Sequence, residues 1–90
     1  MNRIVEYLRN HSSVDHPIKG KDIASHFGIS GIKVREEVNR ARCTGVPICS
    51  SSSGYFYSND KDQIRKTVDS MSGRISAQEN AICGLQSLLI

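Results

Sequence analysis

The most constraining feature of this chain is a glycine-containing break between two helical patterns in residues 19–45, KGKDIASHFGISGIKVREEVNRARCTG. Before the break, Ile23, Ala24 and Phe27 recur at helical spacing, which predicts a short helix with one apolar side. Gly28 follows, where a helix can end with a positive φ that glycine adopts without steric cost. The chain is therefore expected to turn sharply at Gly28.

A second helical pattern begins directly after the turn. Ser30 is a favourable N-cap, and the apolar residues of the following helix are Val34, Val38 and Ala41, with Gly45 at its end. Two helices joined by a three-residue turn that contains glycine form a helix-turn-helix. Packing alone also permits an αα-corner that binds no nucleic acid.

The next segment, VPICSSSSGYFYS, predicts a β-hairpin over residues 46–58. Val46 and Ile48 lie before a Ser/Gly centre, and Tyr55 and Tyr57 lie after it, as in two short β-rich arms around a turn. A flexible linker does not normally run straight into three aromatic residues. We therefore expect an ordered turn here.

The beginning of the chain supplies one more helix, predicted over residues 2–10, and a short extended piece at Ile18. The apolar residues of this helix are Ile4, Val5 and Leu8. The order helix, short strand, helix, helix, hairpin is that of a winged helix-turn-helix. The predicted fold class is mainly α with a small β-hairpin (α+β), in which a winged helix-turn-helix domain over residues 1–58 is followed by a long C-terminal helix over residues 59–90.

Residues 3–58 resemble the winged-helix DNA-binding domain of the biotin operon repressor type. The matching residues are Ile18, Ala24, Gly28-Ile29-Ser30, Val34, Val38, Gly45-Val46 and Gly54-Tyr55. The resemblance implies that the domain binds double-stranded DNA. Two features depart from it: Lys19 stands where Ser or Thr usually caps the second helix, and the wing is rich in serine instead of Lys or Arg. These 90 residues contain no counterpart of the ligase domain, so we expect no biotin chemistry and no cofactor.

The outer face of the third helix holds the candidate DNA-reading residues, because a helix-turn-helix places that face in the major groove. The candidates for base contacts are Ser30, Gly31, Ile32, Lys33, Arg35 and Glu36. Asn39, Arg40 and Arg42 lie farther along, and the two arginines are expected at phosphates. Further DNA contacts are expected from Lys19, Lys21, Ser51, Ser52, Ser53 and Tyr55. The alternative is an ordinary solvated face with Glu36–Arg40 or Glu37–Arg40 ion pairs.

Charge and cysteine content narrow the function classes. Residues 1–58 hold eight basic and five acidic side chains, a net charge of +3, whereas residues 59–90 hold four of each. A polyanion would therefore meet the first part. We expect a reduced cytoplasmic protein without a membrane span or metal site; a metal sensor that uses Cys43, Cys49 and histidines is the alternative. No motif pairs a nucleophile with a base, so we expect no enzyme.

The C-terminal third carries an apolar stripe at 4-3 spacing, which is typical of a coiled-coil seam of nearly four heptads. Its residues are Ile64, Val68, Met71, Ile75, Gln78, Ile82, Leu85 and Leu89. We expect this helix to form a homo-oligomer, either a dimer or a tetramer. The alternative is a helix that folds back on the first domain with a bend at Gly73 or Gly84.

These observations favour a sequence-specific double-stranded DNA-binding protein, a small transcriptional regulator of the kind that phages and mobile elements often encode. Two alternatives remain open. One is a DNA-binding accessory protein in replication or DNA processing, and the other is a winged-helix module that binds proteins.

Overall fold

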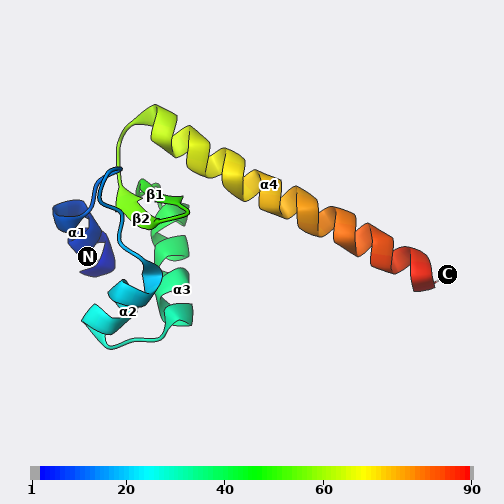
Figure 1. The fold of residues 1–90 in the computed structure, drawn as a ribbon, viewed down its shortest axis with the longest axis horizontal. Coiled ribbons are helices and arrows are strands. Elements are labelled where there is room, and N and C mark those ends of the chain that lie inside the picture. The colour runs from blue at the N-terminus through cyan, green and yellow to red at the C-terminus, as the bar shows by residue number, and fades with distance from the viewer. Residues whose placement is uncertain (1–2, 90) are drawn as a thin grey trace.

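The computed structural model describes residues 3–89, which form helices, one hairpin and a long projecting helix (Figure 1). The α-helices are α1 (Arg3–His11), α2 (Gly20–Phe27), α3 (Gly31–Cys43) and α4 (Lys61–Gln86), the strands are β1 (Ile48–Ser51) and β2 (Gly54–Tyr57), and a 3₁₀ turn, η1 (Ser87–Leu89), follows α4. This α+β arrangement confirms the predicted fold class, and it is compatible with a winged-helix shape. Asn2 and Ile90, which the predicted helix ranges included, lie outside the described residues, as does Met1.

The helix boundaries follow from the capping residues. Gly28 ends α2 in the left-handed conformation with φ 64°, and the side chain of Ser30 accepts a hydrogen bond from the Lys33 amide at 3.1 Å at the start of α3. Asp60 caps α4 by accepting a bond from the Asp62 amide at 2.9 Å. Lys19 occupies the N-cap position of α2 and makes no side-chain capping bond. The glycine turn and the serine cap of the sequence prediction are confirmed.

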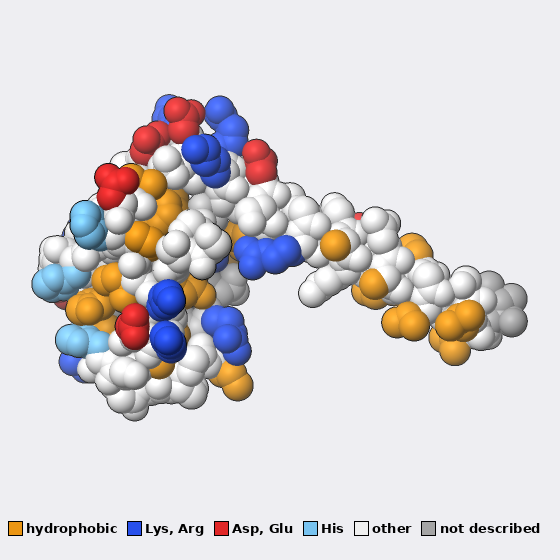
Figure 2. Space-filling view, in the orientation of Figure 1, with side chains coloured by type: hydrophobic (Ala, Val, Ile, Leu, Met, Phe, Trp, Pro, Cys, Tyr) orange, Lys and Arg blue, Asp and Glu red, His pale blue; other side chains and the backbone are white. Residues whose placement is uncertain are grey.

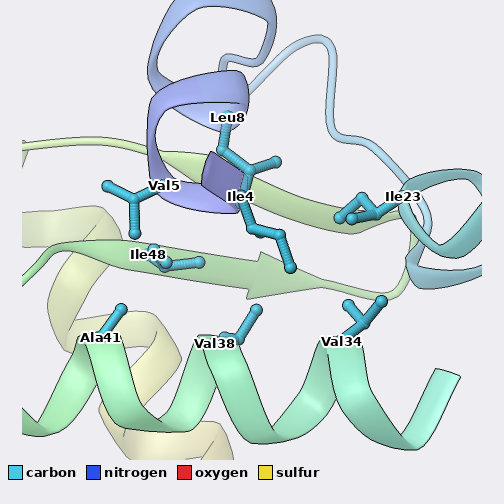
Figure 3. Close-up of a cluster of buried hydrophobic side chains, with 8 residues drawn as sticks. All are labelled: Ile4, Val5, Leu8, Ile23, Val34, Val38, Ala41 and Ile48. Carbon is cyan, nitrogen blue, oxygen red and sulfur yellow. The ribbon is translucent and has the colours of Figure 1, made fainter. Parts of the chain in front are cut away.

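The core lies between α1, α2, α3 and the inner face of the hairpin. Figure 3 shows the side chains of α1 directed toward the apolar face of α3, with β1 between them. The buried members are Ile4, Val5, Leu8, Ile23, Val34, Val38, Ala41 and Ile48. Burying these side chains supplies the main favourable free energy for a domain of this size. It also fixes one face of α3 against the core, so the opposite face is left to solvent.

The hairpin is antiparallel, with Ile48 opposite Tyr57 and Ser51 opposite Gly54, and both of its edges are covered. On the β2 edge, Ile18 exchanges two backbone hydrogen bonds with Tyr55, at 2.8 and 2.9 Å. On the β1 edge, the Ser50 amide donates to the Thr67 hydroxyl of α4 at 3.2 Å. Covered edges have no free row of backbone groups to pair with other chains. The hairpin is thus held by the chain before α2 and by α4.

The long helix α4 contacts the hairpin only through its first turns and then projects away from the domain (Figure 1). Thr67 is its only buried residue among those described, whereas Ile75, Ile82 and Leu85 are exposed. The helix is continuous through Gly73 and Gly84, without the bend that the alternative required, and its residues after Met71 project away from the domain instead of folding back on it. Leu89, predicted as the last residue of the seam, lies in η1 beyond the α-helix.

Gly54 provides a test of the hairpin geometry. Its φ is 138°, and a Cβ at this position would lie 2.5 Å from the carbonyl oxygen of Ile18. We expect Gly54→Ala to lower the free energy of unfolding by about 2 kcal/mol or more, because both the backbone conformation and the clash are unfavourable. Denaturant unfolding measures this change.

Gly31→Ala is the matched control, because an added Cβ there meets nothing within 4 Å and its φ is not positive. We expect it to change the stability by no more than about 0.5 kcal/mol. Equal stability of the two variants would contradict the close approach of Gly54 to Ile18.

Candidate nucleic-acid interface

The outer face of α3 is open to solvent along its whole length. All eight candidates on or next to this helix are exposed: Ser30, Gly31, Ile32, Lys33, Arg35, Glu36, Asn39 and Arg40. Ile32, in the first turn, is 62% exposed and places an aliphatic side chain among the charged ones. The structure therefore brings the candidate base-reading residues together on one accessible surface.

A half-buried acidic residue at the edge of this surface binds two of the cations. The Glu37 carboxylate is 3.1 Å from the Lys33 ammonium and 3.2 Å from the Arg40 guanidinium. The predicted Glu37–Arg40 ion pair is present, and Glu37 also binds Lys33. Lys33 and Arg40 are exposed, and pairs of this spacing on a helix stabilise it by only a few tenths of a kcal/mol, roughly 0.2–0.5. Lys33 and Arg40 can therefore leave Glu37 and bind a phosphate or a base with only a small loss of helix stability.

Arg42 lies beside the hairpin and not on this outer surface, and its side chain makes contacts within the protein. Its expected contact with phosphate stays a prediction. Its Nε donates to the Ile48 carbonyl oxygen at 2.8 Å, and its Nη2 donates to the Ser50 hydroxyl at 3.2 Å. Its guanidinium also lies 5.7 Å from the centre of the Tyr55 ring. Arg42 thus fastens the C-terminal end of α3 to the hairpin.

The surroundings of Arg42 determine its electrostatics. Burial lowers the pKa of the guanidinium, and the positive charge of Arg74 on α4 lowers it further. An arginine side chain nevertheless remains charged at physiological pH. In the part of the chain described here, neither Arg42 nor Arg74 has a carboxylate in an ion pair. Two neighbouring cations without an acid favour an anion from outside the chain.

An open polar hollow lies beside these arginines, between the tip of the hairpin, the start of α2 and α4. It is lined by Lys19, Arg42 and Arg74, by the serines Ser50, Ser51, Ser52, Ser53 and Ser70, and by Gly20, Gly54 and Tyr55. None of its lining residues within 3–89 carries a carboxylate. Figure 2 shows basic side chains over the α2–α3 side of the domain and at its junction with α4. Hydroxyl donors beside cations suit a phosphate group.

The hollow changes the interpretation of the serine-rich wing. Ser51, Ser52 and Ser53 are exposed, as expected for contact residues, and the positive charge missing from the wing comes from other elements. Tyr55 is half-buried and forms part of the wall. Lys21 is exposed but does not line this hollow.

Sequence reasoning missed Ser70 and Arg74, because both were assigned to a separate oligomerisation helix. The available signal was their spacing from Thr67. Positions three and seven residues after a residue that faces the domain lie on nearly the same side of a helix. Only the docking of α4 on the edge of β1 shows which side that is.

The predicted oligomerisation seam is divided by this docking. Ile64 and Met71 are half-buried beside the hairpin, whereas Val68, Ile75, Gln78, Ile82, Leu85 and Leu89 are exposed. The orange side chains of Figure 2 follow one side of the projecting part of α4. Whether this stripe pairs with another helix stays a prediction.

Other kinds of site have little support among residues 3–89. No group of three or more His, Cys, Asp or Glu side chains is placed to hold a metal ion there. Cys43 and Cys83 are exposed and Cys49 is buried, and all three are free thiols. None of the helices in this range has the length and apolarity that a bilayer crossing requires.

Comparison of the chain with protein-family models, curated proteins and solved structures finds no match.

Arg42 and Arg40 form a matched pair for testing the role of Arg42. Arg42→Met leaves the Ile48 carbonyl without its side-chain donor, so we expect the free energy of unfolding to fall by about 1–3 kcal/mol. Arg40→Met removes only an exposed ion pair with Glu37, and we expect a loss of no more than about 0.5 kcal/mol. Thermal or denaturant unfolding measures both. A smaller loss for Arg42→Met than for Arg40→Met would show that Arg42 does not hold the hairpin.

Proposed function

We propose that this protein binds double-stranded DNA in a sequence-specific manner through α3 and acts as a small transcriptional regulator in the cytoplasm, as an oligomer held by α4. The observation that carries the proposal is the division of α3 into two faces. Val34, Val38 and Ala41 are buried in the core, while the opposite face presents an unbroken set of exposed side chains able to contact bases.

The chemistry of the exposed face fits the major groove. Lys33 and Arg35 can donate to guanine, Glu36 can accept from the amino group of cytosine, and the aliphatic side chain of Ile32 can contact a thymine methyl group. These residues lie in the first turns of α3, the part of a recognition helix that usually reaches base edges. A surface with this mixture of donors, acceptor and methyl contact suits selection among sequences better than a purely basic surface does.

The polar hollow supports the same proposal by offering a place for backbone phosphates. Lys19 and Arg42 supply positive charge on either side, and the wing hydroxyls supply neutral donors. Phosphate contacts fix the orientation of a protein on the duplex without reading its sequence. Phosphate contacts in the hollow would then supply affinity, and base contacts from the first turns of α3 would supply sequence selectivity.

The resemblance of residues 3–58 to the biotin operon repressor type supports a DNA-binding domain of that kind. The helix-turn-helix, the bridge at Ile18 and the hairpin occur in the order that such domains have. A short regulator of this kind is also consistent with a phage or mobile-element origin.

Removing the two basic residues from the first turns of α3 tests which surface reads DNA. We expect Lys33→Ala with Arg35→Ala to weaken binding to a selected target by at least tenfold and to flatten the preference for that target over random DNA, since each good base contact is worth roughly 1–3 kcal/mol. Fluorescence anisotropy with both DNAs at a fixed salt concentration measures affinity and preference.

Lys61→Ala with Lys66→Ala provides the control, because it removes the same charge from exposed positions on α4. We expect a modest and equal loss for both DNAs. An unchanged preference in the α3 variant would show that α3 is not the reading element.

Glu37 gives a second test with the opposite sign. Glu37→Gln releases Lys33 and Arg40 from their ion pairs, so we expect DNA binding to tighten by roughly threefold or more and the salt dependence to steepen. Salt titrations of DNA affinity measure both effects. Glu6→Gln removes the same charge from an exposed position on α1, and we expect a smaller gain. Equal gains would mean that only net charge matters.

One observation favours a second candidate function, a winged-helix module that binds another protein. Ile32 is 62% exposed, and an isolated aliphatic side chain on an accessible helix also suits a protein interface. Gel-shift experiments at moderate salt separate the two functions. Failure to retain any duplex, including a random-sequence pool, would favour the protein-binding module and would also remove the alternative of a DNA replication or processing accessory.

A further inference from the structure

We propose that α4 pairs with α4 of a second copy of this chain as a parallel, in-register, two-stranded coiled coil. This inference rests on the self-association included in the proposed function. It adds that the two helices run parallel, that there are two of them, and that polar side chains favour this arrangement. The side chains of the projecting helix are best suited to pairing with the same helix of a second copy.

The projecting part of α4 has the composition of a helix that is covered in its working state. Between positions 75 and 89 the only charged residue is Glu79. The large apolar side chains of the same segment are exposed by 53–85%: Ile75, Ile82, Leu85, Leu88 and Leu89. A helix surrounded by water usually carries charges over most of its surface. An exposed apolar stripe of this kind marks an interaction surface.

The order of 4-3 spacings assigns the heptad positions. Val68, Ile75 and Ile82 occupy a positions, and Ile64, Met71, Gln78 and Leu85 occupy d positions. β-branched residues at a combined with Leu at d favour two parallel strands. Val68, Ile75 and Ile82 are β-branched, and Leu85 supplies a leucine at d.

Gln78 favours the parallel, in-register arrangement. When two copies run parallel in register, the Gln78 amides of both chains lie in the same layer and can hydrogen-bond to each other. In a fully overlapped antiparallel pair, Gln78 would lie opposite Ile75, and its amide would be buried without a partner in that layer. An unsatisfied buried amide costs roughly 1–3 kcal/mol. Gln78 therefore discriminates between the two orientations.

The charges beside the seam discriminate in the same direction. Arg74 occupies a g position and Glu79 the next e position, and a parallel dimer brings g of one chain close to the following e of the other. Two Arg74–Glu79 pairs would form, one on each side of the seam. In the antiparallel arrangement, Arg74 would face Ala81 and Glu79 would face Ser72 instead. No described residue of the same chain forms an ion pair with either side chain.

The position of the domain leaves this seam accessible. Thr67, the residue that faces β1, occupies a g position, and at 100° per residue it lies roughly 50° around the helix from the middle of the seam. A mainly apolar hollow on the seam side is lined by Val46, Pro47, Ile64, Val68 and Met71, among others. The first turns of the second helix would fill this hollow. Both domains would then lie at the same end of the coiled coil.

Disulfide trapping tests the orientation in the full-length protein. In a Cys43→Ser, Cys83→Ser background, Leu85→Cys places one exposed thiol at a d position, while buried Cys49 stays in place. In a parallel pair, the two new thiols share a layer and are close enough for a disulfide. In a fully overlapped antiparallel pair, they are separated by about 17 residues, or roughly 25 Å. We expect dilute oxidant to link most of the Leu85→Cys chains as dimers.

Two further variants make the trapping decisive. Lys66→Cys, at an f position on the outer side, should give little cross-linking. A mixture of Val68→Cys and Leu85→Cys chains, distinguishable by mass, should form no mixed disulfide, because these positions share a layer only in the antiparallel arrangement. A mixed disulfide as the main product would overturn the parallel orientation and leave self-association intact.

Sedimentation of the unmodified chain decides the remaining outcomes. A mass of two chains is expected, and a mass of three or four would overturn the two-stranded arrangement. A monomer at tens of micromolar would remove both this inference and the self-association on which it rests. None of these results depends on DNA, so a failure of the DNA-binding proposal would be seen separately.

Charge reversal provides an independent measurement. Glu79→Arg alone should weaken the dimer roughly fivefold or more, because each Arg74–Glu79 pair becomes repulsive, and combination with Arg74→Glu should restore the affinity. A Glu79→Arg chain whose dimer affinity is unchanged, or is not rescued by the second reversal, would contradict the parallel register.

Discussion

The structure depends on how the two-stranded hairpin is held at both edges. An isolated hairpin of this length is marginal in water, and exposed edges invite pairing with other chains. Here Ile18 pairs with Tyr55 at one edge, while Arg42 and Thr67 bind the backbone of β1 at the other. Because these contacts come from three separate parts of the chain, the hairpin joins the domain and α4 into one structure.

This arrangement links folding to the proposed function. Arg42 lies at the end of α3, so the contact that anchors the hairpin also fixes the orientation of the candidate recognition helix. The same docking brings Arg74 to the serine-rich tip of the hairpin, where it lines the polar hollow. A change in the position of α4 would therefore alter the hollow directly, and dimerisation and phosphate binding would share one element.

Much of the fold could be predicted from the sequence, because its signals are local. Gly28 and Ser30 set the turn, and the spacing of Val34, Val38 and Ala41 sets the buried face of α3, as the structure confirms. The role of Arg42 could not be predicted, since its partners Ile48 and Ser50 belong to the hairpin and their placement depends on tertiary packing. Arg74 was missed for the same reason. The DNA-reading and oligomerisation roles stay predictions.

Selection of fragments from a random-sequence duplex library tests the central claim most directly, because it assumes no target. The account predicts that the wild-type protein enriches a short common motif, and that the double substitution Lys33→Ala and Arg35→Ala abolishes or changes this motif while some duplex binding remains through the hollow. Recovery of fragments without any common motif, or of none above background, would contradict sequence-specific recognition by α3.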